Sequence, residues 1–372
     1  MLKGIWATTC AQRLLIAFAM LLPFSAFAQQ PQEKWGFTAS ALGGYVWAHK
    51  GSVANLKAHV YGGMLGFKFQ TANRKQWHRI YNKPAWGVDV LYLYYGNPNI
   101  VGSVYGLLPY VEFPFFKKFG ANFNLKVNWG LGYVTQPFDV ATNTSNNAVG
   151  SHLNGSLCVH GIINIPLSPK SELNLVGGLT HFSNGNFKMP NLGINSPEIK
   201  IGYTRYLRIK KVEEELPNDM DTLRNSYLLT AAFASKYTDY IFPKRVLVGS
   251  LQFKYLRTLA AKSKFGGGLD LFYDEGNFYV ENRKGIASKG NADKAIEVAV
   301  KVGHELQFGR LALITDIAAY LYNTNKVKGP IYQRIGLRGQ ITKQVGIYTA
   351  LKVHFARADY FEWGVNYRIN NR

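Results

Sequence analysis

His181 and Ser183 are separated by one residue in a segment of alternating apolar and polar residues. A serine hydroxyl is a poor nucleophile until a base removes its proton, and histidine is the usual base. At i and i+2 of a strand the two side chains point the same way, within reach of a hydrogen bond. A third group has to orient the imidazole, and the candidates are Asn195 and Glu198, while Asn184 or a backbone N–H group could donate to an oxyanion. The pattern predicts a nucleophile and a base for acyl transfer.

The strand that carries this pair has one mainly apolar face and one mainly polar face. The face of His181 and Ser183 also holds Leu173, Leu175 and Leu179. The opposite face holds Glu172, Asn174, Thr180 and Asn184, with Val176 and Phe182 as apolar exceptions. In a membrane barrel the apolar face meets lipid. Two polar residues at the end of a strand often have no chemical role, but their place on a lipid-facing surface favours a function.

The composition is typical of many strands rather than of a helical enzyme. Aromatic residues make up 14% of the chain and charged residues 17%, and there are 37 glycines. Beyond the N-terminal segment no run of 18 or more apolar residues occurs, so no helix is expected to span a bilayer. Segments of about ten residues with period-two hydrophobicity recur instead, most clearly in 123–133 and 345–355. These features predict an all-β fold, an antiparallel transmembrane β-barrel.

Connection lengths give the expected topology. The first eight strands are predicted at 35–47, 60–71, 85–97, 101–115, 123–138, 152–167, 171–184 and 198–207. Barrels of this class have short periplasmic turns and longer outer loops. The short connections 116–122 and 168–170 are then periplasmic, and the long ones at 138–151 and 185–197 are extracellular. The connections 71–84 and 98–100 go against this rule, but the count as a whole places His181 and Ser183 in the outer leaflet.

A second set of about eight strands is predicted after a charged stretch. We expect a signal peptide at 1–28, a barrel at 29–207, a charged periplasmic linker at 208–223 and a second strand-rich half at 224–372. The later strands are predicted at 225–238, 245–260, 264–274, 294–308, 311–323, 329–342, 345–356 and 359–369. Tyr320-Leu321-Tyr322-Asn323 echoes His181-Phe182-Ser183-Asn184, so the second half is a candidate degenerate repeat. Whether the strands close as one barrel, as two, or as a barrel with an appendix stays open.

The N-terminus and the charge narrow the partners. Lys3 and Arg13 precede an apolar run, and Ala26-Phe27-Ala28 gives a small-x-small cleavage site, as in a secretory signal. Cleavage would remove Cys10 and leave Cys158 as the one cysteine of the given sequence. Neither an internal disulfide nor a cysteine metal site is therefore expected. The net charge of +21 favours binding to anions. For a secreted chain that is rich in strands, we expect anionic lipid rather than nucleic acid as the partner.

The stretch 179–195, LTHFSNGNFKMPNLGIN, resembles the signature of the PagL-like lipid A 3-O-deacylases, also called acyloxyacyl hydrolases. These are eight-stranded outer-membrane barrels with a lipid-facing Ser-His-Glu triad. The resemblance covers about 35–207 and implies that His181 is the base, Ser183 the nucleophile and Asn184 the neighbouring polar residue. Pro190, Asn191 and Gly193 match the loop that follows. Short members of the family have no counterpart of the second half.

One position departs from the family pattern. The acid of the family falls on Asn195, where an amide can hold the imidazole tautomer but cannot stabilise the imidazolium by charge. Glu198 would substitute for the acid if the loop bends towards His181. The site is then either active with altered support or impaired, and the sequence leaves both open.

These observations predict an outer-membrane esterase without a cofactor or a metal. It would remove an ester-linked acyl chain from lipid A or lipopolysaccharide, with Lys188 binding lipid phosphates. The alternative is a non-catalytic outer-membrane barrel that serves as a scaffold, a channel or a surface-binding protein. The sequence gives no oligomeric state.

Overall fold

The computed structural model describes residues 32–48, 51–212, 225–238, 244–278, 292–355 and 357–370, without the side chains of Val327 and Asn370. The predicted signal peptide lies outside these residues, as does the linker from residue 213 onwards. Within the described residues, none of the helices is long and apolar enough to cross a membrane.

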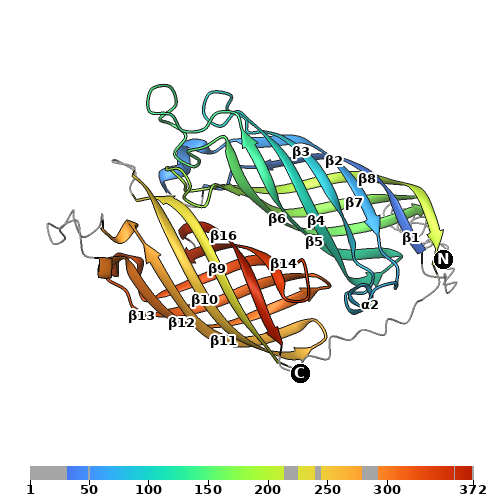
Figure 1. The fold of residues 1–372 in the computed structure, drawn as a ribbon. Helices are drawn as coiled ribbons and strands as arrows, with labels where there is room; N and C mark the ends of the chain where they lie inside the picture. The colour runs from blue at the N-terminus through green and yellow to red at the C-terminus, as the bar shows by residue number, and fades with distance from the viewer. Residues whose placement is uncertain are drawn as a thin grey trace, which may run out of the picture.

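The described residues form sixteen strands in two closed antiparallel barrels (Figure 1). The first barrel contains β1 (Gln32–Tyr45), β2 (His59–Gln70), β3 (Ala85–Tyr94), β4 (Ser103–Lys118), β5 (Ala121–Val134), β6 (Leu153–Ser168), β7 (Ser171–Ser183) and β8 (Ile194–Lys211). Each strand pairs with the next, and β8 pairs with β1 to close the barrel. The open question of one barrel or two is thereby answered.

The second barrel has the same plan. It contains β9 (Asn225–Tyr237), β10 (Arg245–Ala260), β11 (Ser263–Asp274), β12 (Ile296–Phe308), β13 (Leu311–Tyr322), β14 (Ile331–Gln340), β15 (Val345–His354) and β16 (Arg357–Asn370). It closes through the pairing of β16 with β9. Short helices lie in connections of the two barrels: η1 (Gly51–Leu56), α2 (Gln76–Ile80), η2 (Ala292–Ala295) and η3 (Lys326–Lys328).

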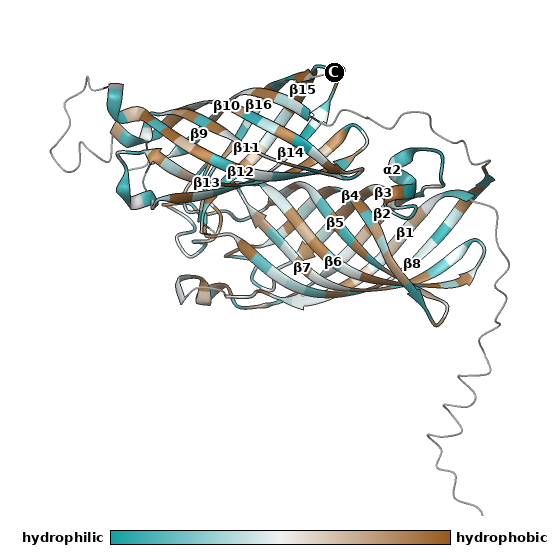
Figure 2. Ribbon diagram, turned by 90° about the horizontal axis from the view of Figure 1, so that it is seen from below, coloured by the Kyte–Doolittle hydropathy of each residue, from teal (hydrophilic) through white to brown (hydrophobic). Residues whose placement is uncertain are grey.

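Both barrels turn apolar side chains outward and polar ones inward. On the outside Leu65 is 66% exposed and Ile199 72%, whereas Lys68, which points inward from β2, is 3% exposed. Brown and teal alternate along the strands in Figure 2. The period of two puts every second residue on the same face, and closure leaves no unpaired backbone in hydrocarbon. The second barrel has this apolar exterior too, with Phe233 66% and Trp363 55% exposed, so both barrels suit a bilayer.

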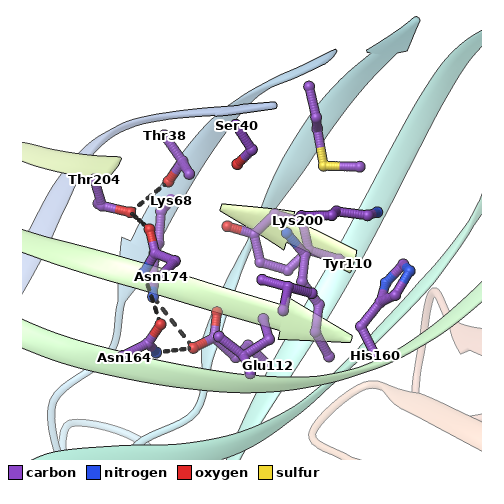
Figure 3. Close-up of a pocket in the computed structure, with 14 residues that line it drawn as sticks. Thr38, Ser40, Lys68, Tyr110, Glu112, His160, Asn164, Asn174, Lys200 and Thr204 are labelled. Carbon is purple, nitrogen blue, oxygen red and sulfur yellow. Dashed lines mark hydrogen bonds and ion pairs between the residues drawn. The ribbon is translucent and has the colours of Figure 1, made fainter. Parts of the chain in front are cut away.

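Charged networks fill the interiors. In the first barrel Lys68 Nζ lies 2.8 Å from Glu172 and 3.2 Å from Glu112. In the second, Arg334 lies between Asp270 and Glu362, each 2.6 Å away. The cavity in Figure 3, in the first barrel, measures only about 30 Å³ and is lined by Lys68, Glu112 and polar neighbours. This is room for only about two waters, so side chains fill the space around it.

The two barrels contact each other at both ends and share one orientation (Figures 1 and 2). At the end with the shortest turns, the ring of Tyr81, just after α2, lies 4.8 Å from that of Phe308 at the end of β12. At the other end Asn186, after β7, donates to the backbone carbonyls of Tyr237 and Asp359 at 3.3 and 3.1 Å. The short-turn ends therefore lie together, as do the ends with the long loops.

The predicted strands agree with the structure to within about four residues, with corrections around β8. The sequence predicts a linker from residue 208, but β8 continues through Lys211 and pairs with β1 as far as Gln32. Charge there marks where the strand leaves the apolar belt rather than where pairing ends. At its other end β8 begins at Ile194, not at 198.

The proposed echo does not fall on equivalent strands. Tyr320 and Tyr322 lie on β13, the fifth strand of its barrel, whereas β7 is the seventh of the first barrel. A few alternating residues recur in any membrane strand, so they do not fix a strand's position in a barrel.

Candidate functional site

The outer ends of β7 and β8 bring together three predicted site residues. His181 on β7 lies directly opposite Asn195 on β8. The imidazole Nδ1–H donates to Asn195 Oδ1 at 2.7 Å, and Ser183 Oγ–H donates to His181 Nε2 at 2.9 Å. These two hydrogen bonds connect an amide, an imidazole and a hydroxyl in a single line on the outward face of the barrel.

This line has the arrangement of a serine nucleophile and its base. With its proton on Nδ1, His181 presents a lone pair on Nε2 to the Ser183 hydroxyl. The base can therefore take the hydroxyl proton as the oxygen attacks a carbonyl. The third residue, Asn195, fixes this tautomer through its carbonyl oxygen but carries no charge.

The β7–β8 loop supports the site through residues of the predicted motif. Asn191 Oδ1 accepts the backbone N–H of Asn184 at 2.8 Å, which closes the loop on itself. Gly193 has φ +80°, and a Cβ there would lie 2.6 Å from His181 Cε1. Glycine is therefore required both for the positive φ and for the approach of the imidazole.

Asn184 has a structural place in this loop. Its side-chain amide donates to Ser151 Oγ at 2.9 Å and to the Lys188 carbonyl at 2.7 Å. Both amide hydrogens are taken, so its contacts do not fit the predicted donation to an oxyanion. The amide instead ties the loop to the β5–β6 connection.

Glu198 does not reach His181. It points into the barrel, 3% exposed, where it accepts from Thr180 Oγ1 at 3.0 Å and lies 3.1 Å from Lys200 Nζ. Since β8 begins at Ile194, residues 195 and 198 lie in the same strand and face opposite sides. The expectation that Glu198 replaces the acid is wrong for this reason.

Lys188 lies exposed in the same loop. Its backbone carbonyl accepts from the Asn184 side chain at 2.7 Å, and its role as a phosphate ligand stays a prediction.

Two residues near the site are not predicted from the sequence. Ser151 holds Asn184, and the Phe361 ring of β16 lies against Gly155 and Gly185 beside Ser183. Neither belongs to a motif, and Phe361 is brought there only by the packing of two barrels. No signal in the sequence points to it.

Cys158 is fully buried. Among the residues that the structure describes, no three His, Cys, Asp or Glu side chains are placed to hold a metal ion.

Family models match both halves of the chain. The lipid A 3-O-deacylase (PagL) model matches residues 61–204, and the acyloxyacyl hydrolase C-terminal domain model matches 225–371. The chain belongs to the PagL lipid A 3-O-deacylase family. It is accordingly an outer-membrane β-barrel protein of an ester-hydrolase family. Each barrel corresponds to one of the two models, so the second half is a recognised domain of the family rather than an appendix.

Two solved barrel structures each match a little under half of the chain. The outer membrane enzyme PagL matches 44% of this chain and 97% of its own, with 17% identity and a TM-score of 0.33. The Neisserial surface protein A (NspA) matches 46% of this chain and 96% of its own, with 12% identity and a TM-score of 0.33. A comparison with curated proteins gave no match.

Proposed function

We propose that this protein is an outer-membrane esterase that removes an ester-linked acyl chain from lipid A, with Ser183 as nucleophile and His181 as base. The observation that carries the proposal is the hydrogen-bonded line Ser183–His181–Asn195 on the lipid-facing side of a barrel. Membership in a lipid A deacylase family supports the same substrate class.

The chemistry proceeds in two acyl transfers. Ser183 Oγ attacks the ester carbonyl while His181 Nε2 takes its proton. The tetrahedral intermediate collapses, and the bond between the acyl carbon and the sugar oxygen breaks. His181 gives its proton to the leaving sugar oxygen. Water then attacks the acyl-serine with His181 again as base, which releases the fatty acid and restores Ser183. Backbone amides of the loop after Ser183 are our candidates for the oxyanion, since the Asn184 side chain is occupied.

The surroundings suit a lipid with an anionic headgroup. Leu179 and Ile199 form an apolar outward surface below the site on β7 and β8, where an acyl chain would lie. Lys188 lies in the outer loop at the level of the headgroup, and we assign it to a lipid phosphate. The acyl chains of the substrate would thus lie along the membrane-facing surface of the barrel, and its phosphates would lie at the β7–β8 loop.

The alternative, a non-catalytic barrel, is less well supported. A passive channel through the first barrel does not fit the side chains that fill its interior around the small cavity. A scaffold or surface-binding role predicts no chemical effect of a change at Ser183.

The test is mass spectrometry of lipid A from outer membranes that contain the protein, Ser183→Ala or Ser103→Ala. Ser103 lies at the outer end of β4, away from the site, and serves as the matched control. We expect loss of one ester-linked acyl chain with the natural protein and with Ser103→Ala, but not with Ser183→Ala. Identical spectra from all three folded proteins would contradict the proposal and favour the scaffold.

A further inference from the structure

The second barrel borders the nucleophile of the first. Ser183 is only 8% exposed although its side chain lies on the outward face. Its partner on β6 is Gly155, and residues opposite each other in an antiparallel pair have their Cβ atoms about 5 Å apart. A Cβ on Gly155 would lie 3.4 Å from Cε2 and Cζ of Phe361. The Phe361 ring therefore lies beside Ser183, on its β6 side.

The loop that follows Ser183 packs on the same ring. Gly185 has φ +60°, and a Cβ there would overlap the Phe361 ring. The next residue, Asn186, exchanges backbone and side-chain hydrogen bonds with Tyr237 of β9. Its side-chain amide also donates to the Asp359 carbonyl of β16. The second barrel thus contacts the loop of the site through a ring and through backbone hydrogen bonds.

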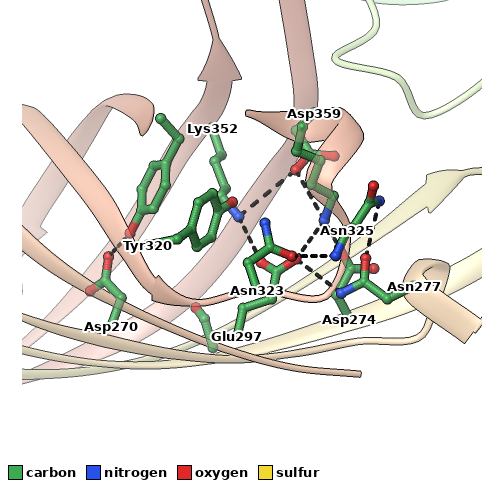
Figure 4. Close-up of polar contacts among 12 residues, drawn as sticks. Asp270, Asp274, Asn277, Glu297, Tyr320, Asn323, Asn325, Lys352 and Asp359 are labelled. Atoms are coloured by element: carbon green, nitrogen blue, oxygen red, sulfur yellow. Dashed lines mark hydrogen bonds and ion pairs between the residues drawn. The ribbon is translucent and has the colours of Figure 1, made fainter. Parts of the chain in front are cut away.

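The strand that carries Phe361 is held from inside its own barrel. Lys236 Nζ lies 2.7 Å from Asp359 and 2.7 Å from Asp274, all three at least nine-tenths buried. Figure 4 shows Asp359 and Asp274 within this network, which continues to Glu297 and Lys352. Asp359 precedes Phe361 by two residues and lies at an irregularity in the β15–β16 pairing, which lets it point inward while Phe361 points outward. The network therefore anchors the β16 backbone close to the ring.

The other side of the site is open to lipid. On β8, next to His181, the outward residues are Asn195, Pro197 and Ile199, of which Ile199 is 72% exposed. A substrate chain can therefore approach along β7 and β8. On the β6 side the Phe361 ring covers Ser183 at the level of Gly155, whereas Leu157 and Val159, deeper along β6, are 36% and 43% exposed. A bulky side chain beside the nucleophile restricts the width of the acyl chain next to its ester carbonyl. The length of the acyl chain would instead depend on contacts with the atoms farther from the carbonyl.

We propose that Phe361 determines the specificity of the deacylase by limiting the width of the acyl chain near its ester carbonyl. The site then prefers an ester chain with a free hydroxyl at its third carbon over one that bears a second acyl chain there. This inference rests on the proposed function, because it names the form of lipid A that the same site accepts.

The experiment compares rates on two purified lipid A species in detergent micelles, one with a hydroxyacyl ester and one with an acyloxyacyl ester at the cleaved position. The full-length protein, Phe361→Ala and Phe361→Leu are assayed beside Trp363→Ala. Trp363 lies on the same strand and face, is 55% exposed, and does not border the site, so its loss is the matched control. Heat-modifiable mobility in gels reports folding of each variant.

We expect Phe361→Ala to raise the acyloxyacyl-to-hydroxyacyl rate ratio by about fivefold or more, Phe361→Leu by less, and Trp363→Ala by less than about twofold. An unchanged ratio in folded Phe361→Ala, or in Phe361→Leu if the alanine variant fails to fold, would overturn the inference. A ratio that rises equally in Trp363→Ala would overturn it as well. Absence of cleavage of both lipids by the natural protein would count against the proposed function instead.

Discussion

Replacement of Asn195 by aspartate would put a negatively charged carboxylate in place of the amide that accepts the hydrogen bond of His181. Asn195 Oδ1 accepts from His181 Nδ1 at 2.7 Å, and aspartate has the same length and the same acceptor. The Asn195 amide can also turn its NH₂ group towards Nδ1. That orientation favours the tautomer with its proton on Nε2, which cannot accept the Ser183 hydroxyl proton. A carboxylate has no N–H to donate and therefore favours only the tautomer that can. We therefore expect Asn195→Asp to deacylate lipid A faster than the natural protein.

The size of the effect follows from the charge that forms on the imidazole. When His181 takes the serine proton, a carboxylate at position 195 would lie about 4 Å from the centre of the imidazolium. Such a pair is worth about 1 kcal/mol in water and about 4 kcal/mol at the effective dielectric constant of a protein surface. His181 and Asn195 are both half-buried, so an intermediate value applies. Since 1.36 kcal/mol is a factor of ten in rate, we expect about 10- to 100-fold.

The assay is the initial rate of fatty-acid release from purified lipid A in micelles. Asn99→Asp, in the exposed β3–β4 connection at the same outer end, adds an equal charge away from the site and serves as the control. Asn195→Ala, which removes the acceptor, is expected to be slower than the natural protein.

A folded Asn195→Asp variant that is no faster than the natural protein would refute the argument that the missing charge limits the rate. An Asn195→Ala variant with the natural rate would refute the role of the amide in orienting His181.

Two further predictions concern positioning and stability. Gly193→Ala should lower the deacylation rate about 100-fold, because the added Cβ would displace His181. Gly120 also has a positive φ but has open space around it, so Gly120→Ala should leave the deacylation rate unchanged. Deacylation rates within threefold of the natural protein for both folded variants would contradict this. Lys68→Met should lower the free energy of unfolding in urea by about 3–5 kcal/mol, because it leaves two buried glutamates unpaired. A loss below about 1 kcal/mol, or an equal loss in the exposed control Lys117→Met, would show that the buried pairs contribute little.

The sequence by itself determined the strands and the side on which the pair lies. Alternation has a period of two, so the apolar residues of β7 fix the outward face, and with it the direction of His181 and Ser183. The bounds of the strands followed from the same period and from turn lengths. The local motif also supplied Asn191 and Gly193, whose roles depend on residues only a few positions away.

The tertiary structure decided what lies beside this pair. Asn195 rather than Glu198 reaches the imidazole because β8 begins four residues before the predicted strand, and strand pairing sets which residues face outward. The closure into two barrels depends on pairings of β1 with β8 and of β9 with β16, which no local pattern encodes. Phe361 comes to the site across about 180 residues of chain, because the side-by-side packing of two closed barrels places β16 there. Local periodicity specifies the direction of a side chain, whereas contacts between distant strands specify its neighbours.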